Sequence, residues 1–179
     1  ANASVVVKGG AGADVITISA SDLAESVIAG AGADSINFAS ANLTSIDVID
    51  GGAGTDTMKV SDDVAIVDAD FTNVTNVETL SSTGTGISTI VTLGAEAMGA
   101  GIATVNLIDT GAATDSVTVG AGFTSALAID LDGGSVVNTV NATNYTGALT
   151  VTATIAEMAS AVMVLTGGSG SDTLTVDLA

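Results

Sequence analysis

The chain of 179 residues carries 20 acidic side chains against two lysines, which gives a formal net charge of −18, and it contains no histidine, cysteine or proline. So few basic side chains exclude a nucleic-acid binder, which needs a basic patch, and the lack of cysteine excludes disulfides and thiolate metal sites. No apolar run approaches the roughly 18 residues of a membrane span. Because only 2% of the residues are aromatic, the core must come from aliphatic side chains and threonine, which favours β-strands.

A glycine-aspartate turn occurs four times along the chain, at residues 9–16, 29–36, 51–58 and 167–174. The first copy is Gly-Gly-Ala-Gly-Ala-Asp-Val-Ile, and the second departs from the full pattern in having Ala29 at the first glycine position. The shared pattern, G-G-x-G-x-D-x-U-x, is the signature of calcium-binding parallel β-helices. The turns therefore predict both an ion and a repetitive β-architecture.

Short β-prone runs lie beside these turns and through the rest of the chain. Four or five residues alternate or run apolar, as in half-buried or buried strands, at 15–18, 35–38, 116–119, 150–153 and 173–176. Helical patterns are few, and residues 20–26 and 94–98 predict a turn or two at most.

A second repeat lies between the glycine turns, with most of its intervals between 20 and 31 residues, in the range typical of solenoids. A unit this short cannot bury its own apolar face, so a stack of about seven coils must form the core. We predict an all-β fold, one continuous parallel β-solenoid or β-roll over residues 1–179, as a segment or processed part of a larger surface protein. The units begin at Leu23, Leu43, Phe71, Ile102, Phe123, Tyr145 and Met158. The aromatic side chains expected in a stacked core are Phe38, Phe71, Phe123 and Tyr145.

Two insertions, at residues 59–76 and 81–101, interrupt the repeat. In a solenoid such insertions are expected to form loops on one side, which is often the interacting side. The first contains four aspartates that are either paired catalytic acids or solvated loop acids. Since the chain lacks the histidine, arginine and cysteine that usually assist such acids, we expect no enzyme. These aspartates are Asp62, Asp63, Asp68 and Asp70.

The chemistry of the glycine turn suits calcium. Glycines permit positive φ, so that carbonyl oxygens point inward, and the aspartate adds a carboxylate. Calcium takes six to eight oxygen ligands at roughly 2.3–2.6 Å, more than one turn supplies. Asp14, Asp34 and Asp56 belong to consecutive coils and therefore predict two bridging sites. The candidate ligand residues are Gly10, Gly12, Asp14, Gly30, Gly32, Asp34, Gly52, Gly54, Asp56, Gly168, Gly170, Asp172 and Asp115.

Other interpretations of these residues stay open. The motifs are alternatively ordinary glycine-rich turns with solvated aspartates. Three further acids stand just before glycines or their equivalents and are either second ligands or turn caps: Asp50, Asp109 and Asp132.

Degenerate copies of the motif are expected to continue the same column of turns, metal-free or with weak binding. Residues 108–117 keep Asp115 but have one glycine, and residues 131–138 have Asn138 where the aspartate belongs. Residues 83–87 have no acid.

The four glycine turns resemble the RTX (repeats-in-toxin) family of calcium-binding β-rolls. The intervening units, such as residues 71–80, resemble repeats of large secreted bacterial surface proteins, including S-layer proteins and adhesins. The resemblance implies type I secretion, calcium-driven folding outside the cell and a structural or adhesive role. In this chain longer connectors separate the motifs, which favours a broader solenoid with calcium along one edge.

Three functions compete at this point, all for a secreted, extracellular or cell-surface protein. The first is a self-assembling S-layer or filament component whose partners are copies of itself. The second is an adhesin stalk or ligand-binding module, with a cell-surface glycan as partner for the loops at 59–76 and 81–101. The third is a noncatalytic module of a secreted enzyme. An exposed strand at a terminal coil invites end-to-end pairing, which favours the first.

Overall fold

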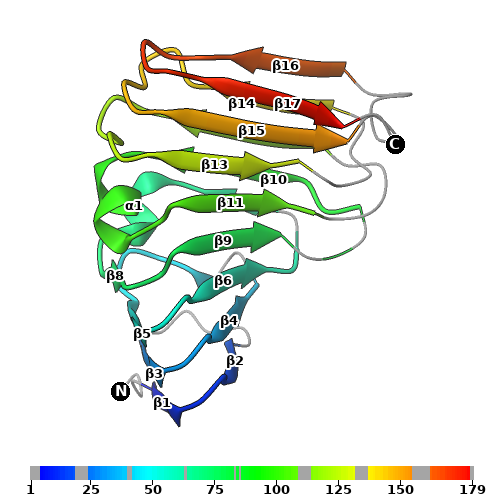
Figure 1. Ribbon diagram of the computed structural model, residues 1–179. Helices are drawn as coiled ribbons and strands as arrows, with labels where there is room; N and C mark the ends of the chain where they lie inside the picture. The colour runs from blue at the N-terminus through cyan, green and yellow to red at the C-terminus, as the bar shows by residue number, and fades with distance from the viewer. Residues whose placement is uncertain are drawn as a thin grey trace.

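The computed structural model describes residues 5–18, 24–39, 42–62, 64–82, 84, 86–108, 114–131, 137–154 and 162–177. These residues form a parallel β-solenoid, with the N-terminus at one end of the stack and the C-terminus at the other (Figure 1). The predicted fold class is confirmed. The eight strands of the largest sheet, one from each level of the stack, agree closely with the predicted number of coils.

Three parallel sheets make the sides of the solenoid. The long sheet has the order β17-β15-β13-β11-β9-β6-β4-β2, the N-terminal sheet β1-β3-β5-β8 and the C-terminal sheet β16-β14-β12-β10-β7. The strands of the long sheet are β2 (Val15–Ile18), β4 (Ser35–Phe38), β6 (Thr57–Val60), β9 (Thr79–Ser82), β11 (Thr104–Leu107), β13 (Leu127–Asp130), β15 (Leu149–Thr154) and β17 (Thr173–Asp177). Those of the N-terminal sheet are β1 (Val5–Ala11), β3 (Glu25–Ala31), β5 (Val48–Ala53) and β8 (Val74–Thr75). Those of the C-terminal sheet are β7 (Val64–Ile66), β10 (Thr89–Leu93), β12 (Thr114–Val119), β14 (Val137–Asn141) and β16 (Val162–Thr166).

Side-chain alternation explains why the short runs form strands. Successive residues of a strand point to opposite faces, and in the long sheet the inward positions are apolar and stacked in register. The column Ile16, Ile36, Met58, Leu80, Val105, Ile129 and Val151 is buried throughout. The five predicted strands all exist, because this alternation is visible in the sequence.

The core is one cluster of aliphatic side chains with a few aromatic ones inside it. Phe38, Phe71, Phe123 and Tyr145 are all buried, as predicted, and the rings of Phe123 and Tyr145 have centroids 6.1 Å apart. The other leading residues of the repeat that the structure describes, Leu43 and Ile102, are buried too, whereas Leu23 and Met158 lie outside the described residues.

The two insertions do not form loops, so that prediction is wrong. Residues 59–76 contain β7, the 3-10 helix η2 (Asp68–Phe71) and β8, and residues 81–101 contain β10 and the helix α1 (Ala95–Ala100), which packs on η2. The strands β7 and β10 are short and mostly apolar, but the aspartates and the Ser, Thr and Gly residues around them indicated loops. The insertions thus start the C-terminal sheet and add a third side to the solenoid.

The helical predictions have a mixed outcome. The segment at 94–98 does form a short helix, α1. Of the segment at 20–26, Glu25 and Ser26 belong to β3, and residues 20–23 lie outside the described residues. In the described part of the chain, no helix is long and apolar enough to cross a bilayer.

Candidate metal centre

Acidic side chains stack at the corner where the glycine turns enter the long sheet. One register column runs along this corner of the sheet, at the residue just before most strands and at the first residue of β13 and β15, and we call it the acid column. Its first four members are Asp14, Asp34, Asp56 and Glu78, and its last described member is Asp172. Between them the same position holds Ala103, Leu127 and Leu149. The corner is therefore acidic in the N-terminal coils and apolar in the middle.

Hydrogen bonds connect the acids from coil to coil. The backbone N–H of Asp14 donates to Oδ1 of Asp34, and the N–H of Asp34 donates to Oδ1 of Asp56, both at 2.8 Å. The N–H of Asp56 donates in the same way to Oε2 of Glu78, also at 2.8 Å. Each carboxylate thus holds the backbone of the coil before it, so the three aspartates predicted to bridge consecutive coils do lie together.

The second oxygen of each of these aspartates has no hydrogen-bond partner. Oδ2 of Asp14, Asp34 and Asp56 is buried and unsatisfied, and the exposed fractions of Asp34 and Asp56 are 2% and 0%. An unpaired buried charge is strongly destabilising. Stacked carboxylates also repel one another, and a cation between them offsets both effects. The donor set therefore fits a divalent cation.

Carbonyl oxygens must complete any coordination shell, because three acidic side chains nowhere converge as a metal cluster among the described residues. The glycine turns place such oxygens beside the acid column. A Cβ on Gly9 would lie 2.6 Å from Oδ2 of Asp14 and would overlap the carbonyl oxygen of Ala29 in the next coil. The first glycine thus leaves room for a carboxylate oxygen and a carbonyl oxygen at one place. These are the oxygen ligands that calcium prefers.

The three N-terminal turns share one backbone conformation. Gly10, Gly30 and Gly52 are in register and have φ of +140°, +116° and +96°. The next glycine of each turn, Gly12, Gly32 and Gly54, also has positive φ. Backbone bonds join the turns, from Gly12 N–H to the Ala31 carbonyl at 2.6 Å and from Gly32 N–H to the Ala53 carbonyl at 2.8 Å. The turns continue the ladder of the N-terminal sheet into the corner.

The C-terminal copy of the motif is built differently. Gly168 and Gly170 are not among the glycines with positive φ. Asp172 Oδ1 accepts the N–H of Leu149 at 3.3 Å, and its Oδ2 accepts the N–H of Gly168 at 3.0 Å. The coil before it has a turn around Tyr145 instead of a glycine motif, so this copy has no acidic neighbour below it. Sequence similarity of the four copies did not reveal this difference.

Asp115 lies at another corner, which corrects the prediction that the degenerate copies continue the same column. It is the second residue of β12 in the C-terminal sheet, where Thr89 and Asn138 occupy the same register position. All three are buried, and the N–H of Thr89 donates to Oδ1 of Asp115 at 2.9 Å. Asp115 and Asn138 thus form a polar column of their own. The motif match gave a residue type without showing which sheet the following strand joins.

Three further acids named in the sequence analysis make hydrogen bonds to a neighbouring coil or to nearby backbone. Asp50 accepts a hydrogen bond from Asn76 Nδ2 at 2.8 Å. Asp68 Oδ1 accepts the N–H groups of Gly94 and Ala97 at 2.7 and 2.9 Å, at the start of α1, and Asp70 accepts the N–H of Val67 at 2.9 Å. Asp68 thus caps the start of α1 from the preceding coil, and Asp70 caps the start of η2. Asp63, Asp109 and Asp132 lie outside the described residues.

Glu78 is a member of the acid column that the sequence analysis missed, because its turn has no glycine motif. One signal was available, since Glu78 follows Asp56 by 22 residues, the same interval that separates Asp56 from Asp34.

Stacked turns with buried carboxylates on a parallel solenoid define a β-roll of the calcium-binding kind. Comparison with protein families matches the RTX calcium-binding nonapeptide repeat, in four copies, at residues 44–60 and 164–177. Neither the curated proteins nor the solved structures gave a match. The repeat match and the solenoid together support membership of the RTX β-roll family. RTX nonapeptide repeats bind calcium and are typical of secreted bacterial proteins.

The acid column predicts an unusual pH dependence of stability. Burial raises the pKa of Asp56 above the ordinary 3.8, the N–H of Asp34 lowers it, and the charges of Asp34, Glu78 and Asp50 raise it further. A raised pKa means that the folded state holds a proton that the unfolded chain has released. Without calcium, stability is therefore full below the ordinary pKa and falls as the pH rises through the raised one.

We expect the melting temperature in EGTA to rise when the pH is lowered from neutral towards the ordinary pKa of 3.8. In excess calcium the order reverses, because protons compete with the ion for the same carboxylates. Thermal melts followed by circular dichroism at three pH values, with and without calcium, measure this. A melting temperature in EGTA that falls on acidification contradicts the prediction.

Proposed function

We propose that the chain is a non-catalytic, calcium-stabilised structural module of a secreted protein, and that it assembles end to end with copies of itself in a surface layer or filament. Extracellular modules bind calcium with roughly 0.1–1 mM dissociation constants. Inside the cell the acid column would stay unneutralised, and outside it calcium binding would contribute folding free energy. The calcium-binding repeats support this part of the proposal.

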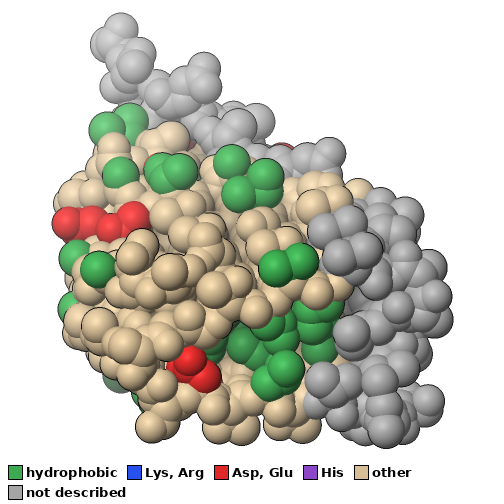
Figure 2. All heavy atoms as spheres, turned by 90° about the horizontal axis from the view of Figure 1, so that it is seen from above, with side chains coloured by type: hydrophobic (Ala, Val, Ile, Leu, Met, Phe, Trp, Pro, Cys, Tyr) green, Lys and Arg blue, Asp and Glu red, His purple; other side chains and the backbone are tan. Residues whose placement is uncertain are grey.

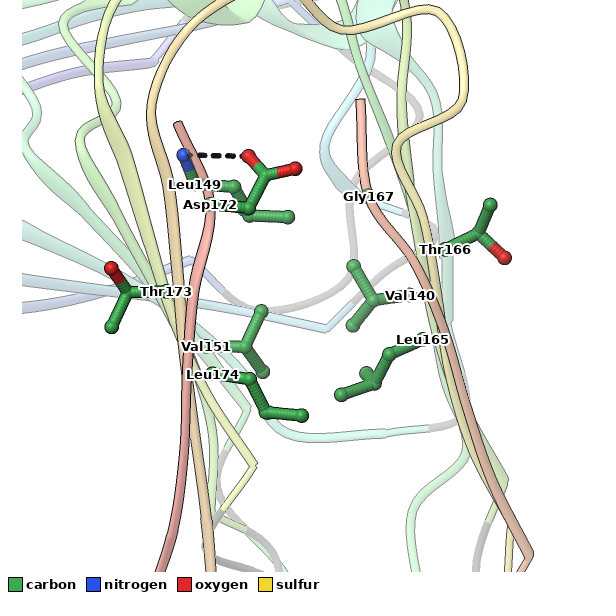
Figure 3. A pocket seen from close by; sticks show the side chains of 9 residues that line it. All are labelled: Val140, Leu149, Val151, Leu165, Thr166, Gly167, Asp172, Thr173 and Leu174. Atoms are coloured by element: carbon green, nitrogen blue, oxygen red, sulfur yellow. Dashed lines mark hydrogen bonds between the residues drawn. The ribbon is translucent and has the colours of Figure 1, made fainter. Parts of the chain in front are cut away.

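The observation that carries the assembly proposal is the open C-terminal end of the solenoid. β16 and β17 are the last strands of their sheets, so one backbone edge of each is unpaired within the described residues. Between them lies a cavity of about 230 Å³, lined mainly by apolar side chains, among them Val140, Val151, Leu165 and Leu174 (Figure 3). Apolar side chains gather in a hollow at this end (Figure 2). Leu174 is 53% exposed. Such an end favours strand pairing with another coil.

The N-terminal coil of a second copy has complementary features. β1 and β2 are the terminal strands of their sheets, so one backbone edge of each is also unpaired within the described residues. In the acid column each aspartate N–H donates to a carboxylate of the following coil. Among the described residues, no coil follows that of Asp172 to accept its N–H, and no coil precedes that of Asp14 to donate to its carboxylate. Stacking the first coil of one copy on the last coil of another would pair these two groups and cover the cavity.

Light scattering across a calcium titration tests this proposal. We expect particle growth in millimolar calcium that EGTA reverses. Leu174→Lys should leave the circular dichroism unchanged and abolish growth, because it places a charge in the covered cavity. Ile90→Lys is the matched control, since Ile90 is similarly exposed, at 49%, but lies on the side of the solenoid in β10.

Monodisperse wild-type protein in millimolar calcium contradicts assembly and favours the adhesin or spacer function. Growth in the Leu174→Lys variant equal to that of wild type places the contact elsewhere than at this end.

A further inference from the structure

The first four members of the acid column, all acidic, make three coil junctions, whereas the aspartates of the N-terminal nonapeptides account for two cation sites. The third junction lies between the turn that ends at Asp56 and the next coil, which has no glycine motif. We propose that this junction holds a third divalent cation of the calcium class, bound by Oδ2 of Asp56, the carboxylate of Glu78 and the carbonyl oxygen of Asn76.

The third junction has the backbone contacts of the first two, and in addition the N–H of Glu78 donates to the Asp56 carbonyl oxygen at 3.2 Å. At each junction the residue after the acid donates to the carbonyl oxygen of the preceding acid. The bonds run from Ser35 to Asp14 at 2.9 Å, from Thr57 to Asp34 at 2.9 Å and from Thr79 to Asp56 at 3.0 Å. The N–H of Asp56 also reaches a carboxylate of the next coil at the same 2.8 Å as its two predecessors.

The oxygen environment of the first glycine is reproduced too. A Cβ on Gly51 would lie 2.8 Å from Oδ2 of Asp56 and would overlap the carbonyl oxygen of Asn76. Around Gly9 the corresponding atoms are Oδ2 of Asp14 and the carbonyl oxygen of Ala29. At both places a carboxylate oxygen of one coil meets a carbonyl oxygen of the next.

The orphaned oxygen of Asp56 is the independent sign of a ligand. Each nonapeptide aspartate directs its Oδ1 to the coil before it, so a cation at each junction takes Oδ2 of the earlier acid. Oδ2 of Asp14 and Asp34 then serves the first two junctions. Oδ2 of Asp56, in a side chain with 0% exposure and without a hydrogen-bond partner, is left for the third.

Glu78 and Asn76 explain how a coil without the motif fits this junction. Gly51 and Asp56 are five positions apart, whereas their counterparts Asn76 and Glu78 are two positions apart. Asn76 makes the tighter turn with φ of +55°, which asparagine tolerates better than most residues. The extra methylene of glutamate lets its carboxylate still reach the N–H of Asp56.

Native mass spectrometry of the full chain at fixed free calcium tests the third site. Glu78→Gln keeps the side-chain length and one acceptor oxygen but removes the charge, and we expect it to bind one calcium ion fewer than wild type. Glu96→Gln, at an exposed position of α1, is the matched control and should bind as many ions as wild type.

A second measurement, by NMR on the unsubstituted chain, does not depend on whether a variant folds. The chain has four glutamates, so ¹³C labelling of their carboxyl carbons gives few signals. We expect one of them to shift on calcium addition and to be the signal missing from Glu78→Gln.

An unchanged ion count in Glu78→Gln, with an unshifted Glu78 signal, would overturn the third site alone. The inference rests on the calcium binding of the repeats and not on assembly. If the wild-type chain bound no calcium at all, both the third site and the proposed function would fail. Loss of the third site alone is therefore distinguishable from failure of the proposed function.

Discussion

Replacing Asp34 by asparagine is expected to remove most of the stabilisation that calcium gives to the N-terminal coils. Asp34 is shared by two junctions, since its Oδ1 accepts the N–H of Asp14 and its own N–H reaches Asp56. At about 10 mM calcium and 0.1–1 mM affinity, each site contributes roughly 1.4–2.7 kcal/mol. Loss of both sites should lower the free energy of unfolding by about 3–5 kcal/mol.

The same variant provides its own control in EGTA. Without the ion, Asp34 is a buried charge between two other carboxylates, so Asp34→Asn should be at least as stable as wild type. Urea unfolding followed by circular dichroism, with calcium and with EGTA, measures both values. An equal loss of stability in the two buffers would show that Asp34 acts only through its hydrogen bonds.

The second large effect is expected from Gly52→Ala. Gly52 has φ of +96°, and a Cβ there would overlap the carbonyl oxygen of Gly30 in the coil below. The backbone conformation alone costs an alanine roughly 1–3 kcal/mol, and the forced separation of two stacked turns adds roughly 1–3 kcal/mol. The variant should therefore unfold its N-terminal coils at clearly lower urea concentration, whether or not calcium is present.

Gly10→Ala separates the two causes of this loss. Gly10 occupies the same register position and has φ of +140°, but no described heavy atom lies within 4 Å of its Cβ position. We expect it to show the conformational cost without the clash, and the difference between the variants measures the stacking of the turns. Equal losses would mean that the turns are not in contact in solution.

The solenoid was predictable from the sequence because the patterns that specify its strands and its glycine turns each lie within a few consecutive residues. A strand such as Val15–Ile18 shows its inward and outward positions in four letters, and the glycine motif specifies a turn conformation that few other residues adopt. The stacking of Asp14, Asp34 and Asp56 followed from their similar spacing.

The third sheet and the membership of the acid column were not predictable in the same way. Which strands share a sheet depends on the path of the connectors, so the motif around Asp115 was assigned to the wrong corner. Glu78 performs the contact of an aspartate with a longer side chain and a shorter turn. The equivalence of Glu78 to the aspartates is visible only in the structure, because a different backbone path brings a different residue type to the same position in the acid column.

The acid column changes from carboxylates in the N-terminal coils to Ala103, Leu127 and Leu149 in the middle coils. The two parts of the solenoid therefore differ in how their stability depends on calcium. Coils with an apolar corner are held by packing at any ion concentration, whereas the N-terminal coils are expected to gain several kcal/mol of stability from the ion. In a repeat protein stability is set by neighbouring units, so one end can open while the rest stays folded. We therefore expect the number of folded coils to depend on the calcium concentration, with fewer N-terminal coils folded when the ion is scarce and all of them folded when it is abundant.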